Sequence, residues 1–258
     1  MYRLIFLSCL AIFKFCCQDL LAQENKNFVS KNLIKFNLSP VVVKSYVVQY
    51  ERVTAKKQSV GLSFGYSPAA TLPFRQLLLD RYGSADGVRQ AIDATRFHKY
   101  NLTLEYRFYT GRQAPKGFYL APFARFVRMN LDENYKFKTI DSIPHNAHLK
   151  SDFSGVGIGL LAGYQWLVSD HFAIDFWIAG PFYGPTMKAS FHGYDPIGNL
   201  SDEDQAELER RIENGNIPGY KIDATVSQNT SGPTTVDVKM KGPYYGIRAL
   251  GVCLVYHF

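Results

Sequence analysis

Residues 100–126 read YNLTLEYRFYTGRQAPKGFYLAPFARF, and the spacing of apolar side chains in this stretch decides the fold class. Leu102 and Leu104 alternate with Thr103 and Glu105, the segment TGRQAPKG follows, and the alternation resumes in FYLAPFARF. A period of two residues is that of a β-strand whose two faces differ, and Gly and Pro mark the turn between two strands. The stretch therefore predicts a β-hairpin.

The same alternation recurs along the chain and predicts about eight strands in one domain over residues 24–258. The other segments that show it are LIKFNL (33–38), SYVVQYER (45–52), SVGLSFGYS (59–67), SGVGIGLLAGYQW (154–166), HFAIDFWI (171–178) and GVCLVYHF (251–258). Several of them approach the length of roughly ten residues that a tilted strand needs to cross a bilayer. The glycines of GVGIGLLAG recur at strand spacing, which favours a strand with one small face over a nucleotide-binding loop.

The connections between the predicted strands alternate in length. Short turns follow the second, fourth and sixth strands, whereas long segments cover residues 68–96, 131–150 and 190–241; a short connection near Pro40 is the exception. Outer-membrane barrels have short periplasmic turns and long extracellular loops. We therefore predict an all-β fold, an eight-stranded antiparallel up-and-down transmembrane β-barrel with long extracellular loops. One or two short helices are expected within 73–95 and one within 201–214. The turn signal NTSGP (229–233) predicts a hairpin between YKIDATVSQ and TTVDVKMK.

One face of the predicted strands is apolar, and the other carries small, polar and charged residues. In a membrane barrel the apolar face meets lipid and the polar face lines the lumen. The charged residues on the lumenal face are Lys35, Glu51, Glu105, Arg107, Arg125 and Asp175. Because buried charges need partners and these signs nearly balance, we expect a structural ion network in a packed lumen, with no catalytic residues and no open pore.

The first 23 residues have the pattern of a secretory signal peptide. Arg3 precedes the apolar core LIFLSCLAIF, and a cleavage site fits near Ala22. A buried N-terminal helix is the alternative. Three of the four cysteines lie in this segment, so an exported chain would keep Cys253 alone and form no internal disulfide.

The last residues present a regular apolar face. Leu250, Val252, Leu254, Tyr256 and Phe258 share one parity, which predicts the lipid face of the last strand and a signal for membrane insertion. Arg248 has the same parity and does not fit a lipid-facing position. Either it lies at the outer rim and snorkels, or a bulge near Gly251 shifts the alternation.

The sequence resembles small outer-membrane β-barrels of Bacteroidota, and within them a family defined only as a domain of unknown function. The resemblance rests on NLIKFNLSPVVVKSYVVQYERV (32–53), LEYRFYTGRQAPKGFYLAPFARF (104–126), GYQWLVSDHFAIDFWIAG (163–180) and Phe258. It implies that the barrel-assembly machinery recognises the last strand. The family has no assigned catalytic residues, so the resemblance transfers none.

These features favour a non-enzymatic protein of the cell outer membrane that recognises an extracellular ligand through its loops. The expected partners are outer-membrane lipid, the barrel-assembly machinery and that ligand. No cofactor or metal is expected, and the net charge of +7 is spread too evenly to predict nucleic-acid binding. Two alternatives stay open. An envelope lipid-modifying enzyme would need His, Ser and an acid together near the outer rim, and Ser190 and His192 raise that question. A soluble lipocalin-like barrel would need an apolar interior.

Overall fold

The computed structural model describes residues 31–71, 75–82, 89, 93, 95–138, 144–195, 202–214, 219–228 and 232–258. The predicted signal peptide at 1–23 lies outside them. The elements, in chain order, are β1 (Asn32–Asn37), the 3-10 helix η1 (Ser39–Val43), β2 (Tyr46–Ala55), β3 (Gln58–Thr71), α2 (Arg75–Tyr82), β4 (Arg96–Tyr109), β5 (Gly117–Lys138), β6 (Pro144–Leu167), β7 (Phe172–Asp195), α4 (Asp202–Glu213), β8 (Lys221–Gln228) and β9 (Thr234–His257). No helix among the described residues has the length and apolar character needed to cross a membrane.

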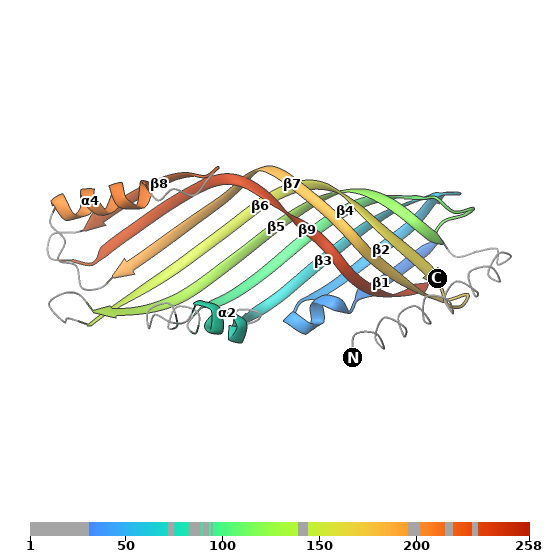
Figure 1. Cartoon of the computed structure of the whole chain (residues 1–258), viewed down its shortest axis with the longest axis horizontal. Helices are drawn as coiled ribbons and strands as arrows, with labels where there is room; N and C mark the ends of the chain where they lie inside the picture. Colours follow the sequence, from blue (N-terminus) through green and yellow to red (C-terminus); the bar gives the residue numbers. More distant parts are fainter. Residues whose placement is uncertain are drawn as a thin grey trace, which may run out of the picture.

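Eight of the strands form a closed antiparallel ring. The order is β1-β2-β3-β4-β5-β6-β7-β9, and β1 pairs with β9 from Leu33↔His257 to Asn37↔Cys253, which closes the circle. The remaining strand, β8, pairs with the outer part of β9 and stands outside the ring. Figure 1 shows the C-terminus at one end of the barrel and α4 with β8 at the other. The predicted eight-stranded antiparallel barrel is thus confirmed.

The strand faces lie as the alternation predicts. On β4 the side chain of Leu104 is 54% exposed, whereas its neighbour Glu105 is 1% exposed. The same contrast holds on β1, where Ile34 is exposed and Lys35 is buried. Apolar side chains thus cover the outer wall, whereas the buried side chains of the interior are polar, charged and aromatic.

The short turns fall where the sequence predicts them, but the long segments differ from simple loops. Strands β5 and β6 continue through most of 131–150, pairing in unbroken register from Asp132↔Lys150 to Lys138↔Pro144. Tyr135 and Phe137 alternate with Lys136 and Lys138 in this segment, so a strand pattern is present although the stretch is rich in charge. The prediction of a loop here was wrong, because the strands continue through it. Residues 131–150 are therefore a projecting hairpin.

The segment 190–241 is also largely ordered. Its predicted helix is α4, and the hairpin foreseen around NTSGP is formed by β8 and β9. Helix α4 covers the free edge of β8: Glu209 Oε1 accepts from the backbone N–H of Val226 at 2.6 Å, and Glu213 Oε1 from that of Ala224 at 3.2 Å. Covering an edge strand in this way protects it from pairing with another chain. In the segment 68–96, α2 confirms the first of the helices expected there.

A shift in the alternation of β9 explains Arg248. Leu250 has φ +52°, in the left-handed region. Two exposed residues, Ala249 and Leu250, separate the buried Gly251 from the buried Arg248, so the alternation shifts by one residue at this point. Of the two explanations for Arg248, the bulge is therefore correct, and its side chain is 5% exposed inside the barrel. Leu250, Leu254, Tyr256 and Phe258 are exposed on the outer wall as predicted, and Val252 beside them is half-buried.

Candidate functional site

Glycines on β6 give the lumen room for large side chains from its neighbours. Gly163 pairs with Tyr119 of β5, and a Cβ at Gly163 would overlap the Tyr119 hydroxyl. Gly159 likewise faces Phe123, whose ring a Cβ would meet at 2.6 Å. The glycine-rich strand therefore lets β5 place a fully buried tyrosine across the lumen beside the charged residues.

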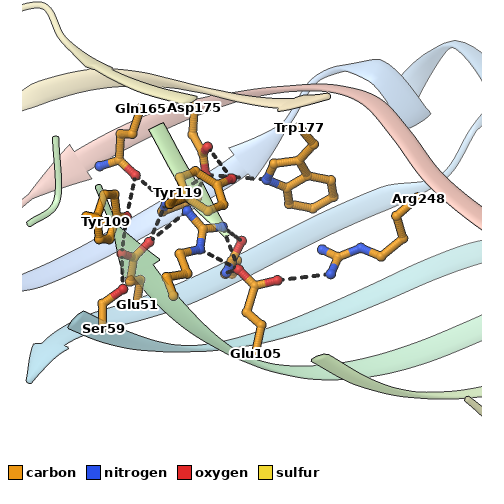
Figure 2. A network of polar contacts seen from close by, with 12 residues as sticks. Glu51, Ser59, Glu105, Tyr109, Tyr119, Gln165, Asp175, Trp177 and Arg248 are labelled. Carbon is orange, nitrogen blue, oxygen red and sulfur yellow. Dashed lines mark hydrogen bonds and ion pairs between the residues drawn. The ribbon is translucent and has the colours of Figure 1, made fainter. Parts of the chain in front are cut away.

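Arg107 lies two residues before β4 ends at a short turn, and it is the centre of a buried ion network. Figure 2 shows this network, with the carboxylates Glu51, Glu105 and Asp175 labelled. The Arg107 guanidinium contacts three carboxylates: Nη2 lies 2.5 Å from Glu105 Oε1, and Nη1 lies 2.7 Å from Asp175 Oδ2 and 3.2 Å from Glu51 Oε2. The side chains of all four residues are inaccessible to solvent. A planar guanidinium presents several fixed donors, which suits it to bridging three strands at once.

Lys35 joins the same carboxylates from β1. Its Nζ lies 2.7 Å from Asp175 Oδ2 and is also paired with Glu51. A third contact, at 2.7 Å, goes to Gln165 Oε1 on β6. Lys35 therefore ties the strand that closes the barrel to its far wall.

Neutral donors satisfy the remaining carboxylate oxygens. The hydroxyl of Tyr119 donates to Asp175 Oδ1 at 2.7 Å, and that of Tyr109 donates to Glu51 Oε1 at 2.7 Å. The Tyr119 ring also lies under the guanidinium, 4.3 Å from its carbon to the ring centroid. Such saturation matters because a buried carboxylate without partners costs several kcal/mol, on the order of the stability of a domain.

The network differs from the predicted set by one exchange. Lys35, Glu51, Glu105, Arg107 and Asp175 lie together as expected. Arg125 does not join them, and no ion pair links it to a carboxylate within the described part of the chain. Its place is taken by Arg248, whose Nη1 donates to Glu105 Oε2 at 2.9 Å while its guanidinium stacks 4.2 Å from the Trp177 ring. Figure 2 shows Arg248 at the end of the network away from Tyr109.

The completed network is electrically balanced. Its three cations are Lys35, Arg107 and Arg248, and its three carboxylates are Glu51, Glu105 and Asp175. Every carboxylate is held by at least two partners and shielded from solvent, so none is free to move a proton or attack a substrate. Among the described residues no group of three His, Cys, Asp or Glu is placed to hold a metal ion. The network fills the lumen at this level, and we call these six charged residues with Tyr109 and Tyr119 the plug.

A second polar cluster lies at the opposite end, on the projecting strands. A cavity of about 980 Å³ is lined there by residues of β4, β5, β6, β7 and β9. His192 Nδ1 lies 2.8 Å from Asp237 Oδ1, and Ser190 lines the same cavity two residues away along β7. All three are exposed, and no hydrogen bond joins Ser190 to His192 in the described structure. The sequence pattern points to Ser190 and His192 but gives no means of finding Asp237, which is distant in the chain.

Comparison with known proteins gives one family match. The model of the family described as "Protein of unknown function (DUF3575)" matches residues 5–194. Among curated proteins, none matches the chain.

Several solved structures are similar to this one at low sequence identity. CarO from Acinetobacter baumannii is 13% identical, with 85% of this chain and 100% of that one covered and a TM-score of 0.34. The outer membrane protease OmpT from Escherichia coli is 9% identical, with 91% and 99% covered and a TM-score of 0.31. The translocator domain of the autotransporter NalP from Neisseria meningitidis is 11% identical, with 97% and 98% covered and a TM-score of 0.34.

Proposed function

The chain belongs to the DUF3575 family, and from its own geometry we propose that it is an integral outer-membrane β-barrel with a closed lumen, exported by its N-terminal segment. Its projecting strands and helix α4 would carry the recognition of a ligand outside the cell. The assignment to Bacteroidota stays a prediction.

The observation that carries this proposal is the inversion of polarity across the barrel wall. The largest fully buried side chains include Arg107, Lys35 and Glu51, whereas large apolar side chains are exposed on the outer wall. In water this arrangement would be unfavourable on both counts, because charges lose hydration and apolar area stays wet. In a bilayer the outer wall is matched to lipid. The same observation disfavours a soluble lipocalin-like barrel, whose interior would be apolar.

The buried network favours a structural protein over a channel. The side chains of Arg107, Tyr119, Lys35 and Gln165 fill the lumen at one level with no solvent access. The projecting hairpin of β5 and β6 and the β8–β9 hairpin with α4 extend well past the plug (Figure 1). The surface available for a partner therefore lies at the end of the barrel that carries α4.

Membrane fractionation tests the proposal. The mature chain should sediment with outer membranes, require detergent for extraction, and migrate differently on gels before and after heating, as closed barrels do. Protease added to intact cells should cut within 190–241 and leave a protected barrel fragment. Recovery of the mature chain in the soluble periplasmic fraction would overturn the assignment.

A lipid-modifying hydrolase is a second candidate, because His192 and Asp237 form the base and orienting acid that such a site needs. Ser190 would be the nucleophile, and the missing element is its contact with His192. The test is hydrolysis of long-chain esters by the detergent-solubilised protein, together with labelling by a serine-directed fluorophosphonate. Loss of both in Ser190→Ala, with both kept in Ser154→Ala, would favour the enzyme. Absence of both in the unmodified protein would exclude it.

A further inference from the structure

The barrel wall is incomplete along one edge of β9. Within the described residues, β1 pairs with that edge only over 253–257, and β8 only over 234–241. Between these two stretches, no strand pairs with the edge, since β1 ends early and the chain turns into η1. The last links are a backbone hydrogen bond from Leu38 N–H to the Val252 carbonyl at 2.8 Å and one from Val252 N–H to Ser39 Oγ at 3.0 Å. Above this point the seam lacks the ladder that closes the rest of the ring.

A cavity of about 310 Å³ lies at this seam, and we call it the seam cavity. Ser39 and Pro40 of η1 and Ala249 of β9 line it at the wall, and Thr103 of β4 and Arg125 of β5 line it across the lumen. It therefore reaches from the gap in the wall to the interior above the ion network. Its volume is at the lower end of the range for small-molecule sites.

The seam cavity carries unbalanced positive charge. Lys99, Arg125 and Arg248 line it, and none of the described residues that line it is acidic. Arg248 is already matched by Glu105 in the balanced network. Lys99 and Arg125 are left as two extra cations, and Arg125 lies close enough to both of the others for their charges to repel. An anion in this cavity would relieve that repulsion.

Two buried donors point to the same conclusion. Thr103 is 1% exposed, and its Oγ1 has no hydrogen-bond partner; the Nε of Arg125 is also buried and unpaired. Thr103 and Arg125 are direct cross-strand partners, so both donors lie at one place in the cavity. Buried donors without partners are uncommon in folded proteins, and an acceptor bound at this place would satisfy both of them.

The height of the cavity and its surroundings identify the class of anion. Lys99 lies ten residues before the end of β4 at Tyr109, which is about the length of strand that crosses a bilayer. The charges thus lie near the level of the outer leaflet headgroups. Outside the gap, Val42 of η1 and Ile247 of β9 present exposed apolar side chains. We propose that the seam cavity binds the anionic headgroup of a membrane lipid, which enters sideways while its acyl chains stay in the bilayer.

This inference rests on the proposed membrane location, and native mass spectrometry of the detergent-solubilised full chain tests it. Phosphatidic acid should remain bound where phosphatidylcholine does not. The double variant Lys99→Gln/Arg125→Gln should lower the affinity for phosphatidic acid about tenfold or more, because two charge-assisted hydrogen bonds are lost. The variant Lys56→Gln/Lys57→Gln removes the same charge from an exposed turn and should bind normally.

The route of entry is tested separately. Ala249→Trp narrows the gap without changing any charge, so it should weaken phosphatidic acid binding and leave inorganic phosphate competition unaffected. Heat-dependent gel migration verifies that each variant is folded. Equal binding by the Lys99/Arg125 variant, or inorganic phosphate that binds as tightly as the lipid with no effect of Ala249→Trp, would overturn the site. A chain that stays soluble without detergent would instead refute the membrane location.

Discussion

At the scale of single residues, the main contrast is between two arginines of the same predicted set. Arg107 contacts three carboxylates at 2.5–3.2 Å and is inaccessible to solvent. Arg125 lies on the same lumenal face with no carboxylate partner in the described structure and an unpaired Nε. The first is part of a balanced plug, whereas the second adds charge to a cavity. Removing Arg107 should therefore cost much more stability than removing Arg125.

We expect Arg107→Ala to lower the free energy of unfolding by about 3–5 kcal/mol, because it leaves three buried carboxylates short of a partner. Arg125→Ala should change it by less than about 1 kcal/mol, because the residue makes no ion pair and repels its neighbours. Urea unfolding in lipid vesicles, followed by the gel shift of the folded barrel, measures both. Similar losses in the two variants would contradict the assignment of the network.

The same two residues show what sequence can foresee. Alternation alone predicts that Lys35, Glu51, Glu105, Arg107 and Asp175 point into the lumen. Five buried charges of both signs are then expected to form ion pairs. Alternation does not give the height of a side chain in the lumen. Alternation therefore groups Arg125 with charges that lie beyond its contacts, and it misses Arg248, whose inward direction depends on a bulge.

At the scale of elements, β9 combines three roles. It closes the ring with β1, pairs along its length with β7, and carries β8 at its outer end. The left-handed Leu250 separates the closing part from the open seam, and it turns Arg248 into the lumen. Sequence predicted the closing part from its apolar face. The outer part also alternates, with Val236, Val238 and Met240 on one face, so a strand is indicated there as well. Alternation does not show that the two parts belong to one continuous strand, Thr234–His257.

The backbone at Leu250 can be tested by glycine. A left-handed conformation costs a leucine about 1–2 kcal/mol that glycine does not pay, whereas glycine inside a regular strand is unfavourable by about 0.5–1 kcal/mol. Both leucines lie on the outer wall, Leu250 80% exposed and Leu254 52% exposed, so the smaller loss of side-chain contact at Leu250 acts in the same direction. We expect Leu250→Gly to be more stable than Leu254→Gly by about 2 kcal/mol in urea unfolding. Equal stability would show that the bulge is unstrained.

The proposed recognition of the last strand by the assembly machinery can be separated from simple lipid contact. Phe258 and Phe172 are both exposed aromatic residues at the short-turn end, and Phe172 contacts Tyr256 at 5.5 Å between ring centroids. Phe258→Ser should reduce the folded barrel in cells several-fold with export unchanged, and Phe172→Ser should not. The readout is the heat-shifted band in outer membranes. An equal effect of the two changes would indicate a lipid contact without recognition.

At the scale of the whole molecule, the barrel is closed at one end and open at the side above that closure. The plug fills the half with short turns, the seam cavity lies above it, and the projecting strands continue beyond. A continuous pore would need the plug removed, because the network and two buried tyrosines occupy the cross-section. On the proposed function, the half with short turns supplies stability and the opposite half binds the ligand.

The closure of the lumen can be tested with variants that keep all the charged residues of the network. Tyr109 of β4 and Tyr119 of β5 pack with ring centroids 5.3 Å apart and fill the lumen beside the network. Tyr109→Ala/Tyr119→Ala should open a water path and give intermittent ion conductance in planar bilayers, where the unmodified protein gives none. Tyr106→Ala/Phe118→Ala removes comparable rings from the outer face of the same strands and should stay closed. A folded Tyr109/Tyr119 variant that never conducts would place the barrier in the ion network, because the charged side chains alone would then fill the cross-section.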